Sequence, residues 1–306
     1  MDGVLNIYKN TGMTSFDVVR IVRKISGEKK VGHTGTLDPE ATGVLPVCLG
    51  KATKIIDYIM TSDKSYVVKF ELGKITTTYD SEGEVISEKD ILHLKNHDIL
   101  EAINSFKGEY SQVPPMYSAL KQNGVRLYEL ARKGIEVERE GRIVKIYDIK
   151  NIEISMPFVT MEVMCSKGTY IRSLCYDIGE KLDVGATVVT LERTQTASFN
   201  KEESINISDL SDSNILTSII SIEDALNSYP KVKVEKGFSK LLINGVKVYD
   251  KRACKENMPL NKLYRIYDEE DRFLGLGLRS KDGLKIEKLL IWLGSESNDY
   301  RKYANI

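Results

Sequence analysis

The sequence predicts an α+β protein with a mixed, mainly antiparallel sheet, flanking helices and a small, β-barrel-like C-terminal domain. Strand and helix patterns follow one another without a regular βαβ repeat, which favours α+β over α/β. Residues 65–73, SYVVKFELG, alternate apolar and polar side chains as a half-buried strand does. From about residue 231, short strands separated by Gly, Asn and Asp turns are typical of a small barrel or sandwich. We therefore expect two domains, residues 1–228 and 229–306.

The first helix is predicted by its capping residues. Within residues 14–27, Asp17 lies three positions after Thr14, which is the spacing of a capping box, and Gly27 ends the helix. Ser15 is the alternative cap. The valines and the basic residues of this segment fall on opposite faces, so the helix is expected to present to solvent Arg20, Arg23 and Lys24.

The other elements follow from periodicity and turn residues. In the first domain we expect strands at 44–50, 65–73, 144–156 and 158–170, the last two joined at Pro157. Helices are expected at 51–60, 96–106, 125–134 and 171–182, with loops at 76–85 and 112–124. A polar connector at 204–215 and a short capped helix at 221–230 lead to strands at 232–238, 240–249, 262–278 and 285–294.

Composition predicts a soluble, cytoplasmic protein, with a monomer as the default. Hydrophobic residues make up 42% of the chain and charged residues 29%, which is ordinary for a globular protein. The first ten residues lack the basic leader and apolar run of a signal peptide, and no apolar stretch is long enough to span a bilayer. The cysteines are scattered without a CxxC pair, so reduced thiols are expected at Cys48, Cys165, Cys175 and Cys254.

The net charge is zero, from 44 basic and 44 acidic side chains, but the charges are unevenly distributed. Residues 229–306 hold 17 Lys and Arg against 11 Asp and Glu, whereas residues 200–228 hold one lysine against six acids. The segment before the first glycine-rich loop is basic as well. Such patches can hold a polyanion in spite of overall neutrality, although most basic clusters are only solvated faces.

The segment GHTGTLDPEATG, residues 32–43, is the strongest candidate for a functional loop. Its glycines permit close approaches and unusual turns, and it carries His33 and Asp38 five residues apart. The order of residues matches neither a P-loop nor a G-x-G-x-x-G fingerprint. A purely structural turn would explain the glycines and Pro39 but not the histidine and the aspartate together.

Other candidates have ordinary structural explanations. His93 and His97 have an i, i+4 spacing, but HLKNH lacks the glutamate of H-E-x-x-H and no third ligand is indicated, so we expect no metal site. Asp80 could pair with Asp38 as in a glycosidase, but an Asx turn before Gly83 is the preferred interpretation.

Four segments of the sequence resemble the TruB family of bacterial tRNA pseudouridine-55 synthases, from Gly3 to about Phe199. They are GHTGTLDPEATGVLPVCLGKATK, KSYVVKFELGKITTTYDSEGE, VPPMYSALKQNGVRLYELARKGIEVEREGR and CSKGTYIRSLCYDIGEKLDVGATVVTLERTQTASF. The C-terminal region resembles, more loosely, the PUA-like RNA-binding domain of that family. Thr77 is a departure, because many members carry an aspartate there.

The resemblance implies a pseudouridine synthase fold and a role for each matching residue. Asp38 would be the catalytic aspartate, and Arg172 would face it. His33 would fill the space that flipped bases vacate in the T-loop. Tyr66 would stack on the target uracil and is a candidate for removing the C5 proton. The pocket would be lined by Tyr170 and Leu191, and phosphates would be held by the basic helix face, Lys51, Lys54 and the C-terminal domain.

The implied reaction isomerises uridine 55 in the T-arm of tRNA by base flipping and covalent catalysis. The uracil is cut from ribose C1′ at N1 and rejoined through C5, so that nothing is oxidised or hydrolysed and no cofactor or metal is expected. The implied partner is tRNA, with no protein partner and no membrane. A non-catalytic tRNA-binding or chaperone protein and a nucleoside glycosidase that uses Asp38 and Asp80 are the alternatives.

Overall fold

The structure is a computed structural model that describes residues 1–250, 253 and 258–291. Cys254, for which the sequence predicts a reduced thiol, lies outside the described residues. The chain forms two compact units, Met1–Ile222 and Glu223–Ile306. Within the described part, no helix is long and apolar enough to cross a membrane.

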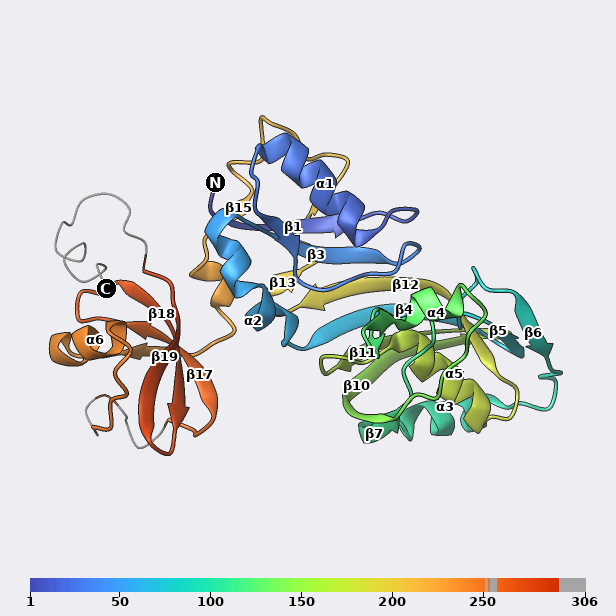
Figure 1. Ribbon diagram of the computed structural model, residues 1–306. Helices are drawn as coiled ribbons and strands as arrows, with labels where there is room; N and C mark the ends of the chain where they lie inside the picture. The colour runs from blue at the N-terminus through green and yellow to red at the C-terminus, as the bar shows by residue number, and fades with distance from the viewer. Residues whose placement is uncertain (251–252, 254–257, 292–306) are drawn as a thin grey trace. The chain divides into compact units, whose positions relative to one another are not determined.

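The first unit is built on one mixed, mainly antiparallel sheet, which confirms the predicted fold class (Figure 1). Among the described residues, its main path runs β14 (Ile205–Asn206), β1 (Gly3–Lys9), β3 (Thr42–Leu49), β12 (Ala186–Thr196), β4 (Lys64–Leu72), β11 (Phe158–Cys165), β10 (Arg142–Ser155) and β7 (Gly108–Gln112). Three short strands join it at the sides: β2 (Val31–His33) on β3, β13 (Phe199–Asn200) on β12 and β15 (Ile219–Ile220) on β1. Strand β12 pairs in parallel with β3 and antiparallel with β4, and so joins the two halves of the sheet.

Helix α1 (Ser15–Ser26) has the predicted caps. The Thr14 side chain accepts from the backbone N–H of Asp17, the Asp17 side chain accepts from the backbone of Thr14, and Gly27 ends the helix at a φ of 63°. Val18 and Val22 are buried, whereas the three basic residues of the helix are exposed. Where a helix is expected at 51–60, a 3₁₀ helix, η1 (Gly50–Ile55), continues into α2 (Ile56–Met60).

The core of this unit lies between the sheet and the helices that pack on it. Helix α5 (Ile171–Lys181) packs on β12 and β4, and α3 (Asn96–Asn104) packs on β10 (Figure 1). The side chains of Phe70, Leu174 and Ile178 are completely buried. Each such burial stabilises the fold by about 1.5–3 kcal/mol. The core therefore holds rigidly the two elements, β4 and α5, that carry Tyr66 and Arg172.

Three predicted elements of the first unit differ from the structure. The strand expected at 158–170 ends with β11 at Cys165. The helix expected at 125–134 is shorter, α4 (Leu127–Ala131), because β8 (Lys121–Gln122) and β9 (Val125–Arg126) form a hairpin before it. Asn123 and Gly124 have φ values of 51° and 84°, which is the Asn-Gly signature of a tight hairpin turn. The turn-rich segment 76–85 is bracketed by a small pair of strands, β5 (Lys74–Thr76) and β6 (Val85–Glu88).

The second unit contains a four-stranded sheet within its described residues. The order is β16 (Lys231–Lys233), β17 (Lys262–Tyr267), β18 (Phe273–Ser280) and β19 (Gly283–Leu289), preceded by the 3₁₀ turn η2 (Asp224–Leu226). The strand expected at 240–249 is wrong over residues 240–243, and the one expected at 232–238 ends at Lys233, because α6 (Lys236–Ile243) forms there. The short helix buries Leu242 against the sheet, so the apolar residues of this segment follow the period of a helix and not the alternation of a strand. Among the described residues, β16 and β19 are the edge strands of this sheet, with Val248 bridged to Leu284 of β19, and closure into a barrel stays a prediction.

Candidate active site

Asp38 lies in a loop that is held by hydrogen bonds on both sides of this residue. Before it, the buried Ser15 hydroxyl accepts from Leu37 N at 2.8 Å and donates to Leu37 O at 3.1 Å. After it, the Pro39 carbonyl oxygen accepts from Lys9 Nζ at 2.9 Å and from Gly12 N at 3.1 Å. Because the peptides on each side are fixed, the direction of the Asp38 side chain is set by the first helix and the first strand.

Lys9 is completely buried, and its ammonium group donates only to backbone carbonyl oxygens among the described residues. The acceptors are Asn10 O at 2.8 Å, Met13 O at 2.8 Å and Pro39 O at 2.9 Å. Burial lowers the pKa of Lys9 to about 8. This lysine is a structural clamp for the Asp38 loop that the sequence analysis did not identify.

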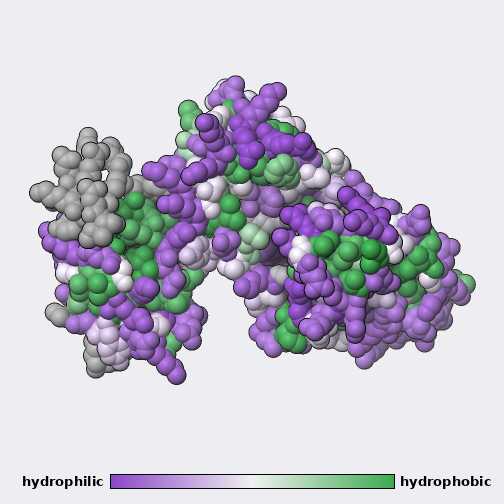
Figure 2. Space-filling model, viewed as in Figure 1, coloured by the Kyte–Doolittle hydropathy of each residue, from purple (hydrophilic) through white to green (hydrophobic). Residues whose placement is uncertain are grey.

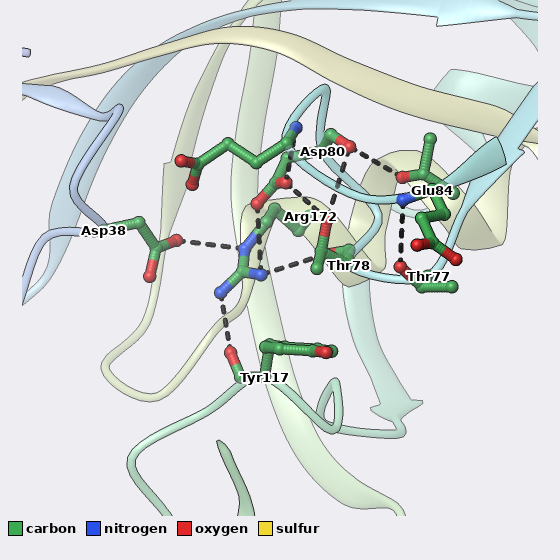
Figure 3. A network of polar contacts seen from close by, with 9 residues as sticks. Asp38, Thr77, Thr78, Asp80, Glu84, Tyr117 and Arg172 are labelled. Atoms are coloured by element: carbon green, nitrogen blue, oxygen red, sulfur yellow. Dashed lines mark hydrogen bonds and ion pairs between the residues drawn. The ribbon is translucent and has the colours of Figure 1, made fainter. Parts of the chain in front are cut away.

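Arg172, on the first turn of α5, places its buried guanidinium against Asp38 (Figure 3). Its Nε lies 2.9 Å from Asp38 Oδ2, and its Nη1 lies 3.2 Å from Asp80 Oδ2. The same group donates to Thr78 O at 2.9 Å and to Tyr117 O at 2.8 Å. The predicted contact between arginine and aspartate is thus present, and the guanidinium is held in one plane by four partners.

The Asp38 carboxylate is surrounded by protein but still reachable from solvent, with 38% of its side chain exposed. Burial raises the pKa of Asp38 above its ordinary value, and the nearby Asp80 charge raises it further. The Arg172 charge and hydrogen bond act in the opposite direction. The arginine therefore favours the ionised form that a nucleophile requires, against the cost of desolvation.

Asp80 combines a local turn with the second carboxylate contact. Its Oδ1 accepts from Glu82 N at 3.2 Å and from Thr78 Oγ1 at 2.5 Å, so the expected Asx turn is present. Its other oxygen contacts Arg172 in addition, which the sequence analysis missed. Thr77 supports the same loop by accepting from Glu84 N at 3.2 Å (Figure 3). A threonine at this position can therefore hold the turn without a carboxylate.

Tyr66 on β4 is 8% exposed and faces the core. Burial raises its pKa to about 12, so the phenol is neutral at neutral pH. A neutral phenol is suited to stacking and hydrogen bonding and is a poor proton acceptor. Leu191 on β12 lies half-buried beside it, in register with Val68, two residues along β4 from Tyr66.

Tyr170 and His33 are held by backbone contacts. Gln112, completely buried, accepts from Tyr170 N at 2.8 Å and donates to Tyr170 O at 3.0 Å, which fixes the N-cap residue that precedes α5. The His33 ring accepts from Gly35 N through Nδ1 at 3.3 Å. Burial lowers the pKa of His33, and the charge of Arg193 lowers it further. The imidazole is therefore favoured in its neutral form.

Lys54 is not among the residues that contact Asp38 or Arg172. It is exposed on η1 and lines a cavity of about 440 Å³ together with Lys29, Lys30 and Lys51. Two acidic residues, Asp2 and Glu28, line the same cavity. The surroundings of Lys54 are thus predominantly basic.

Comparison with known proteins defines the class. The family model described as "TruB family pseudouridylate synthase (N terminal domain)" matches residues 23–171. Those described as "tRNA pseudouridylate synthase B C-terminal domain" and "Pseudouridine synthase II TruB, C-terminal" match residues 172–228 and 230–287. These matches are those of a pseudouridylate synthase.

Whole-chain relatives agree with these family matches. The "tRNA pseudouridine synthase B" of Clostridium perfringens (strain ATCC 13124) is 64% identical over 95% of this chain and 99% of its own length. The protein of the same name in Clostridium tetani is 56% identical over 95% of this chain and 100% of its own. The chain belongs to the TruB family of pseudouridine synthases, as its four segments predict.

Solved structures show the same fold. The structure titled "Crystal Structure of a Cbf5-Nop10-Gar1 Complex" matches with a TM-score of 0.74 and 28% identity, over 94% of this chain and 85% of that chain. The one titled "Structure of H/ACA RNP bound to a substrate RNA containing 2'-deoxyuridine" matches with a TM-score of 0.70 and 25% identity, over 95% of this chain and 85% of that chain.

Proposed function

We propose that this chain converts uridine 55 in the T-loop of tRNA to pseudouridine, with Asp38 as the covalent catalyst. The observation that carries the proposal is the environment of the Asp38 carboxylate. Asp38 is paired with a buried arginine that favours its anionic form, and yet it remains open to an incoming nucleotide. The high identity to proteins named tRNA pseudouridine synthase B supports the same substrate.

The chemistry requires a nucleophile that can also leave. A carboxylate oxygen of Asp38 adds to an electrophilic carbon, either C1′ of the ribose or C6 of the uracil. The bond from C1′ to N1 breaks and a bond from C1′ to C5 forms. The proton lost from C5 is balanced by one gained at N1, and the carboxylate is released unchanged. Uracil leaves as a delocalised anion, so one carboxylate suffices.

The target base must be turned out of the folded RNA, at a cost of a few kcal/mol. Stacking on the ring of Tyr66 offsets about 1–3 kcal/mol of this cost. His33, the last residue of β2 before the loop that leads to Asp38, fills the vacated position in the RNA stack. Tyr170 and Leu191 line the pocket around the base. These roles rest on the matching sequence segments and agree with the half-buried or buried positions of the four side chains.

The partner is the T-arm of tRNA, and the protein acts as a cytoplasmic monomer. The basic face of α1 and the lysines around Lys54 contact phosphates, supported by the exposure of all these side chains. The second unit, with its excess of lysine and arginine, contributes further phosphate contacts as a PUA-like RNA-binding domain.

Tritium release from tRNA labelled at uridine C5 tests the function. We expect release by the wild-type protein and none by Asp38→Asn, because the amide is not a nucleophile. Asp90→Asn is the control, since Asp90 is an exposed loop aspartate that accepts from Leu92 N at 3.0 Å and is not among the contacts of Arg172. It should release tritium at the wild-type rate.

The same assay separates the alternatives. A protein that only binds or folds tRNA would release no tritium in either form. A glycosidase that used Asp38 and Asp80 would produce free uracil, which the isomerase never makes. Equal release by the wild type and by Asp38→Asn would disprove the assignment of the catalytic residue.

A further inference from the structure

Arg193 is a second buried arginine near the site and has a different environment from Arg172. It lies on β12, opposite Tyr66 of β4 in the antiparallel register and opposite Gly43 of β3 in the parallel one. Its side chain is 1% exposed. Within the described part of the chain, no carboxylate forms an ion pair with it, so its charge is buried without a neutralising partner. A buried charge of this kind is costly and therefore needs an explanation.

The guanidinium donates to two other segments of the chain, and Arg193 pairs across the sheet with a third. Its Nε donates to Val44 O on β3 at 2.7 Å, and its Nη2 donates to Gly35 O at 3.1 Å. Tyr66 is the residue directly opposite Arg193 on β4, so the two buried side chains lie on the same face of neighbouring strands. Gly35, in turn, donates its N–H to Nδ1 of His33. Arg193 is thus linked through one glycine to the histidine at the end of β2 and is the cross-strand neighbour of the tyrosine on β4.

The backbone is built to allow this approach. Gly35 has a φ of 142°, and a Cβ on it would lie 3.6 Å from Arg193 Nη1. Gly43 has a φ of 110°, and a Cβ on it would lie 2.2 Å from the Arg193 carbonyl oxygen. A side chain at Gly43 would therefore push β3 away from β12 and separate Val44 O from the guanidinium.

The charge of Arg193 also acts on His33. It is the charged group that lowers the pKa of His33, after burial itself. Because Nδ1 accepts from Gly35 N, the neutral ring carries its proton on Nε2, and protonation of Nδ1 would break that contact. The cation and the hydrogen bond to Gly35 therefore favour the same form of the ring.

We propose that Arg193 is a positioning residue that holds His33, through Gly35, in a fixed place relative to Tyr66, its cross-strand neighbour on β4. The inference rests on the proposed function, in which the two side chains contact the RNA stack and the flipped uracil. A lysine cannot replace the planar fork, because a single ammonium on a flexible stem cannot align with both Val44 O and Gly35 O as Nε and Nη2 do.

Two variants of the full-length protein test the inference. Arg193→Lys should bind tRNA within about threefold of the wild-type Kd but lose about 100-fold in the single-turnover rate at saturating enzyme, since small misplacements of reacting groups have this effect. Arg193→Met removes the charge, so the pKa of His33, followed by NMR, should rise. The chain has three histidines, and His33→Gln assigns the signal.

Thr187→Val is the matched control, because Thr187 is a buried polar residue of the same strand whose hydroxyl donates to Lys74 O at 2.9 Å. Thr187→Val should lower the melting temperature without changing either readout.

A wild-type single-turnover rate in Arg193→Lys, or an unchanged His33 pKa in Arg193→Met, would overturn the inference. If Arg193→Met does not fold, the rate of Arg193→Lys decides. If the wild type releases no tritium, the proposed function fails, whereas the His33 titration still tests the coupling.

Discussion

Arg172 binds two carboxylates and two backbone carbonyl oxygens through one buried guanidinium (Figure 3). Three of its nitrogens are used, each toward a different segment of the chain. Asp80 and the two carbonyl groups hold the plane of the guanidinium, so that Nε is directed at Asp38. The cation thereby has one partly exposed carboxylate as a partner and three further partners that keep it in place.

Replacement of Arg172 by lysine should separate binding from chemistry. We expect Arg172→Lys to bind tRNA normally but to lose about 100-fold or more in single-turnover rate, because an ammonium cannot hold Asp38 while bound to the other three partners. Quench-flow with C5-labelled tRNA gives the rate, and filter binding gives the affinity. A near-normal rate would show that the charge alone, without the planar geometry, is sufficient.

Replacement of Asp80 by asparagine tests the second carboxylate through pH. Asn can still accept from Glu82 N, so the turn should be kept, but the negative charge that raises the pKa of Asp38 is removed. Asp38 should then ionise at lower pH, and the acid limb of the single-turnover pH profile should move to lower pH. The plateau rate should fall by about 10- to 100-fold, because Arg172 loses one anchor. An acid limb that does not move would exclude the electrostatic link.

At the level of residues, the contact between Asp38 and Arg172 was predicted from the sequence, but the residues that support it were not. Asp38 and Arg172 lie in motifs with recognisable chemistry. Lys9, Asp80 and Arg193 contact residues far away in the chain, such as Pro39, Arg172 and Gly35. No local pattern reports such contacts, since they depend on how β1, β12 and the loops come together.

Among the elements, β12 was not predicted, although it is central to the site. Its sequence, ATVVTLERTQT, has buried residues at its start, then charged and polar residues that pattern reasoning assigns to solvent. In the sheet, β12 pairs with β3 on one side and β4 on the other, so Arg193 is buried despite its charge. The alternation of apolar and polar residues does not reveal a central strand when that strand carries polar residues on a buried face.

Gly43, where β3 pairs with β12, should not tolerate a side chain. Gly43→Ala combines a φ of 110° with a Cβ 2.2 Å from a carbonyl oxygen, and should lower the free energy of unfolding by about 2–5 kcal/mol. Gly12→Ala is the matched control. Gly12 also has a positive φ, 74°, but no atom lies near its Cβ position, so about 1–2 kcal/mol is expected. Urea denaturation measures the free energy of unfolding of both variants. Equal losses would show that β3 and β12 can move apart to accommodate the added methyl group.

Strands and helices with strong local signals were predicted well, whereas short apolar runs were not. The capping box of α1 and the alternation of β4 were confirmed. The segment KLLI was expected to form a strand but forms part of α6. An apolar segment this short is compatible with either structure, and here packing against the sheet favours the helix. The Asn-Gly turn between β8 and β9 was a hairpin signal that the helical periodicity of the next segment obscured.

For the molecule as a whole, net neutrality conceals surfaces suited to RNA. Hydrophilic side chains cover much of the visible face of each unit (Figure 2). In the second unit, part of the positive charge is balanced locally, because Lys231 and Lys233 both pair with Asp271 and Lys247 pairs with Asp282. The exposed basic residues of α1 and the lysines that line the cavity beside η1 are concentrated in the first unit.

This distribution predicts a moderate dependence of tRNA binding on salt. Four to six phosphate contacts would give a slope of roughly −3 to −5 when the logarithm of the binding constant is plotted against that of the salt concentration. Lys54→Gln should make the slope less steep by about 1, whereas Lys150→Gln, whose ammonium pairs with Glu162 at 3.6 Å, should leave it unchanged. Filter binding between 50 and 200 mM salt, roughly the range over which such contacts weaken, measures both slopes. A flat response for the wild-type protein would mean that shape and stacking, and not phosphate contacts, supply the affinity.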